Sequence, residues 1–161
     1  MCKYRYILFL FFCILNGQYI NPETGWEFYQ SSNQAFYIFE DLQIDGEPPV
    51  GDGWAPSETL TSECTDNLNS CDVLGAFIND VCIGWVYANS NGQTTLPIMG
   101  IDNTNETIAS LTESYCQDGN VPIIKIYDAT YGTVLDVTSG DVIPGWSYND
   151  VSVIYNISFA S

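Results

Sequence analysis

Short apolar runs with a two-residue period, separated by turn-forming residues, set the strongest limit on how this chain can fold. Such a period is that of a β-strand, whose successive side chains point to opposite faces. In QAFYIFEDLQI, residues 34–44, the apolar residues that share one parity are Phe36, Ile38, Leu42 and Ile44. Glu40 interrupts this parity, so we expect a bulge or a sheet edge there.

Further strands are expected wherever the alternation returns. VLGAFI and VCIGWVYA flank Asn79-Asp80, which predicts a two-residue hairpin connection, although Asn-Gly or Asp-Gly would be a stronger turn signal. Pro97 indicates an edge or an irregularity in the strand that contains it. The other expected strands cover residues 94–100, 121–129, 132–139 and 150–158.

Together these runs predict an all-β fold, an antiparallel β-sandwich of jelly-roll or immunoglobulin-like type with about seven to eight strands. Little helix is expected, only one turn around Ile108 and Leu111 within residues 105–117. The segments 45–70 and 101–120 are long and polar, so we expect them to be surface loops.

The first 17 residues have the pattern of a secretory signal peptide. Lys3 and Arg5 precede an apolar stretch at 7–15, which is about half of the ~20 residues that a bilayer crossing needs. We therefore expect residues 18–161 to form a single domain that is secreted or held at the cell surface. No second segment is apolar enough to span a membrane.

Acidic residues dominate the charge. Of three basic residues, only Lys125 lies outside the expected signal peptide, and one lysine against 20 acids leaves a formal charge of −19. A surface of this charge repels nucleic acid and anionic lipid, which excludes both as partners.

Four cysteines remain after the expected cleavage, namely Cys64, Cys71, Cys82 and Cys116. Oxidising compartments favour disulfides. Cys64 and Cys71 bracket a short polar loop and form the first expected pair, which leaves Cys82 to pair with Cys116 by elimination. A zinc site is the alternative, but the chain has no histidine and no C-x2-C spacing.

The order of these motifs resembles a known module. W-x-F, QAFYIF, DVLGAFINDVCIGW, LPIMGID and VPIIKIYDA occur in that order between about Trp26 and Tyr155. The whole is similar to a β-sandwich module of secreted and cell-surface proteins from Bacteroidetes-like and Marinimicrobia-like bacteria, many of them exported by the type IX system. Its most specific residues here are Gly75, Ala76, Phe77, Cys82, Gly84 and 125–128.

The resemblance implies a module without an assigned activity that often belongs to a longer parent chain. Two departures bear on that expectation. PSETLTSECTDNLNSC looks like an insertion, and no C-terminal sorting domain follows in the sequence.

Catalysis is not expected from this inventory of residues. The chain lacks histidine, G-x-S-x-G and a phosphate loop, which leaves only paired carboxylates of the glycosidase kind. A glycan-active enzyme is therefore less favoured than a structural or adhesive module or a carbohydrate-binding module.

Aromatic residues near loops suggest a binding role instead. Trp54 and Trp146 both lie next to Gly, and Tyr148 follows closely, so these three are the candidate ligand-binding residues for stacking on sugar rings. The alternative is that such rings only pin loops to the core.

Oxygen ligands for calcium cluster in one expected loop. Ca²⁺ takes six to eight oxygens, and the candidate ligands are Asp102, Asn103, Asn105, Glu106 and Asp118. No cofactor is required by the sequence, and calcium is the one metal that it suggests.

The favoured function is a non-catalytic structural or adhesive module of the cell exterior, stabilised by disulfides, whose partners are other surface proteins or glycans. The alternative is a carbohydrate-binding module that uses loop aromatics with or without calcium. A contiguous exposed aromatic platform would favour the second, and buried tryptophans the first.

Overall fold

The computed structural model describes residues 17–56, 63–66 and 70–161. The expected signal peptide, residues 1–17, lies almost wholly outside them. The described elements are β1 (Gln18–Ile20), β2 (Glu27–Tyr29), β3 (Gln34–Glu40), β4 (Gln43–Ile44), α1 (Glu63–Asp66), β5 (Val73–Ile78), β6 (Val81–Tyr87), β7 (Thr94–Met99), α2 (Glu106–Leu111), β8 (Ile123–Asp128), β9 (Thr133–Ser139), β10 (Val151–Tyr155) and β11 (Ser158–Phe159).

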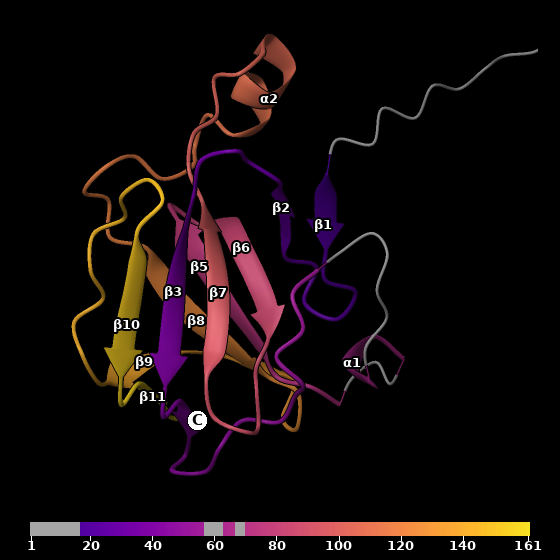
Figure 1. Ribbon diagram of the computed structural model, residues 1–161. Helices are drawn as coiled ribbons and strands as arrows, with labels where there is room; N and C mark the ends of the chain where they lie inside the picture. Colours follow the sequence, from indigo (N-terminus) through magenta and orange to yellow (C-terminus); the bar gives the residue numbers. More distant parts are fainter. Residues whose placement is uncertain (1–16, 57–62, 67–69) are drawn as a thin grey trace, which may run out of the picture.

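Two sheets face each other, which confirms the expected all-β sandwich (Figure 1). One sheet has the order β10-β3-β7, and the other has the order β4-β11-β9-β8-β5-β6. A separate β1-β2 pair lies against β6. The core between the sheets is apolar and contains the fully buried side chains of Tyr37, Phe39, Leu96 and Ile126.

The expectation of a purely antiparallel sandwich is wrong at two places. β10 runs parallel to β3, and β11 runs parallel to β4, while the other described pairs are antiparallel. Both parallel pairs join strands from opposite ends of the chain. Because parallel partners need a long crossover, local turn signals could not reveal them.

The buried side of β3 is the opposite of the one that the alternating pattern emphasised. Ala35, Tyr37 and Phe39 are fully buried, whereas Phe36 and Ile38 are only partly buried. Both faces of this strand are apolar, so parity alone could not choose between them. The expected break at Glu40 is confirmed: β3 ends there, and Asp41 takes a φ of 58°.

The hairpin between β5 and β6 is confirmed at Asn79-Asp80. Both residues have positive φ, 46° and 67°, as a turn with two left-handed central residues requires. The strands on either side pair in antiparallel register from Val73 opposite Tyr87 to Ile78 opposite Val81. The short helix α2 is also confirmed, with Asn105 as its N-cap.

Gly84 and Gly75 allow close approach on the two faces of this hairpin. A Cβ at Gly84 would lie 2.0 Å from the carbonyl oxygen of Pro97 in β7. A Cβ at Gly75 would lie 2.7 Å from the indole of Trp26, which leads into β2. Glycine at these positions therefore lets β7 and the Trp26 ring pack directly on the hairpin backbone. None of the described helices is long and apolar enough to cross a membrane.

Candidate functional site

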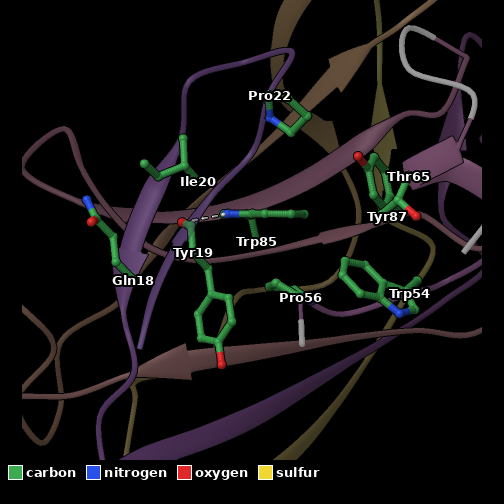
Figure 2. Close-up of a pocket in the computed structure, with 9 residues that line it drawn as sticks. All are labelled: Gln18, Tyr19, Ile20, Pro22, Trp54, Pro56, Thr65, Trp85 and Tyr87. Carbon is green, nitrogen blue, oxygen red and sulfur yellow. Dashed lines mark hydrogen bonds between the residues drawn. The ribbon is translucent and has the colours of Figure 1, made fainter. Parts of the chain in front are cut away.

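One of the candidate sites is an aromatic pocket between β1, β6 and the segment that carries Trp54. It has a volume of about 280 Å³ and is lined by Gln18, Tyr19, Ile20, Pro22, Trp54, Pro56, Thr65, Trp85 and Tyr87 (Figure 2). The Trp85 and Tyr87 rings meet edge to face at 5.7 Å, and the Trp54 and Tyr87 ring centres lie 6.3 Å apart. Trp85 Nε1 donates to the carbonyl oxygen of Tyr19 at 3.3 Å.

The inner wall of this aromatic pocket is part of the core. Trp85 and Tyr87 are buried. Burial raises the pKa of Tyr87, and the nearby carboxylates of Glu23 and Asp52 raise it further, while the Asn21 side chain lowers it. Among the described residues, the buried Tyr87 hydroxyl and Trp54 Nε1 find no hydrogen-bond partner of standard geometry. The pocket thus combines aromatic ring surface with the polar side chains of Gln18 and Thr65.

A groove at the loop end of the sandwich is richer in polar groups. It has a volume of about 540 Å³ and is lined by Asn33, Ile101, Asn103, Cys116, Gln117, Asp118, Trp146 and Tyr148. We call it the Tyr148 groove. Four of the predicted ligand-binding residues line this groove. Trp146 and Tyr148 are predicted to bind sugar, and Asn103 and Asp118 are predicted to bind calcium. Trp54, the third predicted aromatic, lies in the aromatic pocket instead.

Trp146 forms the buried wall of the Tyr148 groove. It is 4 % exposed, and its Nε1 donates to the carbonyl oxygen of Ile98 at 3.0 Å. Its backbone also pairs with the opposite loop, since Gly119 N donates to Trp146 O at 2.8 Å and Trp146 N donates to Asn120 O at 2.7 Å. Tyr148, by contrast, is 55 % exposed. One ring therefore anchors the groove, and the other is available for contact.

Two of the five predicted calcium ligands, Asp102 and Asn105, accept hydrogen bonds from the protein itself. Both Asp102 oxygens are used: Oδ2 accepts from Ser32 N and Ser32 Oγ at 2.7 Å each, and Oδ1 accepts from Thr104 N at 2.9 Å. Asn105 Oδ1 caps α2 by accepting from Ile108 N at 3.0 Å. Within the described ranges, no three His, Cys, Asp or Glu side chains are grouped so that they could hold a metal ion.

Asp102 is instead a buried structural anion. Burial on its own raises the pKa of this carboxyl, but the hydrogen bonds from Ser32 and Thr104 outweigh it and lower the pKa to about 2. The Asp102 backbone N also donates to Thr112 Oγ1 at 2.9 Å. The carboxylate thereby fastens the loop after β7 to the turn before β3.

Asp72 has the same role at another corner of the sandwich. Its Oδ2 accepts from Val50 N at 2.7 Å, and its Oδ1 accepts from Ala129 N at 2.9 Å. Burial raises the pKa of this carboxyl above its ordinary value, and the two backbone hydrogen bonds offset that rise only in part. Nearby Asp128 accepts from Thr130 N and Tyr131 N. These two neighbouring acids thus stabilise turns through backbone amides.

The disulfide prediction is half right. Cys64 and Cys71 are joined as expected, but Cys82 and Cys116 are buried free thiols, so the second expected pair is wrong. Cys82 faces a pocket together with Trp26, Phe77 and Tyr115, while Cys116 faces the Tyr148 groove. Burial raises the pKa of both thiols to about 12.

Asn33 and Gln117 are groove residues that the sequence did not single out. Asn33 lies in the turn before β3 and donates from Nδ2 to Ile101 O at 2.6 Å, so its place depends on a contact with a distant loop. Gln117 follows Cys116 and is exposed beside Asp118. Its place next to a predicted site residue is the local sequence signal that could have selected it.

Comparison with models of protein families, with curated proteins and with solved structures gave no match. A functional proposal therefore rests on the residues of the chain itself.

Proposed function

We propose that the chain is a non-catalytic structural or adhesive module of the cell exterior, which holds its loops in fixed positions for contact with other surface proteins or glycans. The observation that carries the proposal is the use of buried carboxylates to fix loops. Asp102 and Asp72 each accept backbone N–H groups from segments far away in the sequence. Loops fixed in this way lose little conformational freedom when they bind.

Three further features support the same role. The Cys64–Cys71 disulfide closes a loop and is typical of proteins in oxidising compartments. Trp146 pins the loop before β10 to the core. The all-β architecture of facing sheets agrees with a module of this kind.

The Tyr148 groove favours carbohydrate as the ligand, which makes a carbohydrate-binding module the second candidate. Sugars present apolar ring faces and many hydroxyls, so they suit an exposed aromatic ring beside amides and carboxylates. Here Tyr148 is exposed, and Asn103, Gln117 and Asp118 line the same groove. A calcium ion that assists binding would depend on Asn103 and Asp118 together with oxygens of the sugar.

Bead adhesion tests both candidates. Beads coated with residues 18–161 are applied to immobilised glycans and to immobilised extracts of cell-surface protein, with and without EGTA. Retention above that of beads coated with the reduced, heat-unfolded domain is expected. Absence of retention on every surface would contradict the proposed function.

A matched pair of variants tests whether the Tyr148 groove is the sugar-binding site. Tyr148→Ala should weaken retention on glycans by up to roughly tenfold, because stacking on a single aromatic ring contributes about 0.5–1.5 kcal/mol. Tyr131→Ala, at a 70 % exposed tyrosine between β8 and β9 and outside the groove, is the control. Equal losses in both variants would reject the Tyr148 groove as the sugar site.

A further inference from the structure

The pocket that contains the Cys82 thiol is walled by aromatic rings and bordered by acids. We call it the Trp26 pocket. It has a volume of about 330 Å³, and small ligands bind in pockets of roughly 300–1,000 Å³. Its aromatic residues are Trp26, Tyr29, Phe77 and Tyr115, and its acids are Glu27 and Asp80. The proposed function uses none of these six residues.

Segments far apart in the sequence hold the rings of the Trp26 pocket in place. Strand β2, which carries Tyr29, lies beside β6 (Figure 1). Tyr29 N donates to the Tyr115 hydroxyl at 2.7 Å, which ties the loop after α2 to β2. The Trp26 and Phe77 ring centres are 5.0 Å apart, and their planes are nearly perpendicular at 82°. Because the walls are fixed before a ligand enters, binding costs little conformational entropy.

Negative charge lies at the rim of the Trp26 pocket. Glu27 and Asp80 are both exposed. Glu27 Oε2 accepts from the neutral amide of Gln18 at 3.1 Å, a bond that leaves the charge of the carboxylate in place. Burial raises the pKa of Tyr115 to about 12, and the Glu27 carboxylate adds to that rise, so its charge acts inside the pocket. None of the described residues that line the pocket is basic.

One wall of the pocket already attracts a cation of the chain itself. Lys125 Nζ lies 5.8 Å from the centre of the Phe77 ring, within the ~6 Å over which a cation interacts with an aromatic face. Lys125 does not line the pocket, and its charge is paired with Asp136. Tryptophan attracts cations more strongly than tyrosine or phenylalanine. Trp26 is therefore the strongest attractor for a cation that comes from outside the chain.

Hydration decides which kind of cation fits such walls. A primary ammonium is compact and strongly hydrated, so stripping its water costs free energy. A quaternary ammonium instead presents methyl groups that carry the positive charge, and aromatic walls recognise it. An anionic group on the same ligand would be repelled by Glu27 and Asp80.

We propose that the Trp26 pocket binds a small organic cation that carries a trimethylammonium group and no anionic group beside it. The aromatic rings contact the methyl groups, and the two carboxylates at the rim balance the charge. This inference goes beyond the proposed function, because such a ligand is neither a glycan nor a surface protein.

An NMR titration of residues 18–161 with choline in low-salt buffer tests the proposal. The comparison ligand is the neutral isostere of choline, in which carbon replaces the nitrogen. Choline should shift the Trp26 indole and Tyr29 backbone amide signals and bind at least about tenfold more tightly than the isostere. Phosphocholine should bind more weakly than choline. Absence of a shift, or equal affinity of choline and either comparison ligand, would overturn the proposal.

A tryptophan variant assigns the binding to the Trp26 pocket. Trp26→Leu keeps an apolar side chain but removes the aromatic face, so it should weaken choline binding by about tenfold, followed through the Tyr29 amide. Trp54→Leu is the matched control, because Trp54 is also partly buried but lies in the other aromatic pocket. Circular dichroism checks that both variants fold. Equal weakening in the two variants, or none in Trp26→Leu, would reject the Trp26 pocket as the site.

A charge variant keeps the test decisive if Trp26→Leu fails to fold. Glu27→Gln removes one charge at an exposed position and should weaken choline binding by about threefold or more, with little effect on the neutral isostere. Glu47→Gln, at an exposed acid outside the pocket, is its control. Choline binding that is the same in both glutamine variants would contradict the role of the rim carboxylate.

Discussion

At the scale of single residues, Asp102 shows how this acidic chain uses buried charge. The side chain is 3 % exposed, and three hydrogen bonds reach its two oxygens. A carboxylate that accepts several donors is stabilised in its charged form, which lowers its pKa. The sequence DNTNE predicts a calcium ligand at this position, and in the structure its oxygens accept hydrogen bonds from Ser32 and Thr104.

This pairing predicts a specific acid response. Because the pKa of Asp102 falls from 3.8 to about 2 on folding, the carboxylate contributes stability that is fully present above pH ~4 and is lost as the pH falls toward 2. Asp102→Asn should lower the free energy of unfolding at pH 7 by about 2 kcal/mol and flatten its dependence on pH between ~4 and ~2. Urea unfolding at a series of pH values measures both effects.

Asp118→Asn is the control for Asp102→Asn, since it removes an exposed carboxylate from the same region of the chain. It should change the free energy of unfolding by less than about 0.5 kcal/mol. An Asp102→Asn protein as stable as this control would contradict the role given to Asp102.

At the scale of elements, the contact between β6 and β7 depends on Gly84. These strands are consecutive, but they belong to different sheets, so the backbones meet without a ladder of hydrogen bonds. The close approach to the Pro97 carbonyl leaves no room for a methyl group. Backbone, unlike a side chain, cannot rotate out of the way.

Gly84→Ala should therefore lower the free energy of unfolding by about 3 kcal/mol or more, because β6 and β7 must separate. Gly75→Ala is the matched comparison: its Cβ meets the Trp26 indole, which can shift, so the loss should be smaller. Chemical denaturation compares the two. Equal stability of the two variants would show that the junction adjusts more easily than the geometry indicates.

The elements also show what the sequence could and could not predict. The β5-β6 hairpin was predictable because its turn and its alternating residues are adjacent. Pairing of β10 with β3 was not, since nothing local in either strand specifies a partner more than 100 residues away. The buried face of β3 was predicted wrongly for another reason: both faces of this strand are apolar, so alternation alone does not say which one is buried.

The Tyr148 groove was predictable only in part. Loop position and residue type were enough to select Trp146, Tyr148, Asn103 and Asp118. The sequence could not show that these four share one groove, because that depends on the pairing of Gly119 and Asn120 with Trp146. Burial of Asp102, which removes it from the surface, is likewise set by the fold.

At the scale of the whole molecule, unbalanced charge is the dominant feature. Lys125 pairs with Asp136 at 3.6 Å, and its Nζ lies 5.8 Å from the centre of the Phe77 ring. One such exposed pair contributes little to stability. The remaining acids repel one another, and that repulsion opposes the compact state.

Salt should therefore stabilise the domain. Raising NaCl from about 10 mM to about 0.5 M shortens the Debye length from about 30 Å to about 4 Å. We expect the melting temperature to rise by roughly 4 °C for each kcal/mol of repulsion removed. Calorimetry at low protein concentration separates this effect from self-association, and a melting temperature independent of salt would contradict it.

The parallel pairing of β10 with β3 also has a consequence for biosynthesis. The central strand of the smaller sheet acquires one of its neighbours only after residue 155 has been made, and β4 waits for β11 in the same way. Structures dominated by such distant contacts fold slowly. In a nascent chain, the sheet that contains β3 would thus stay incomplete until residue 155 has been translated.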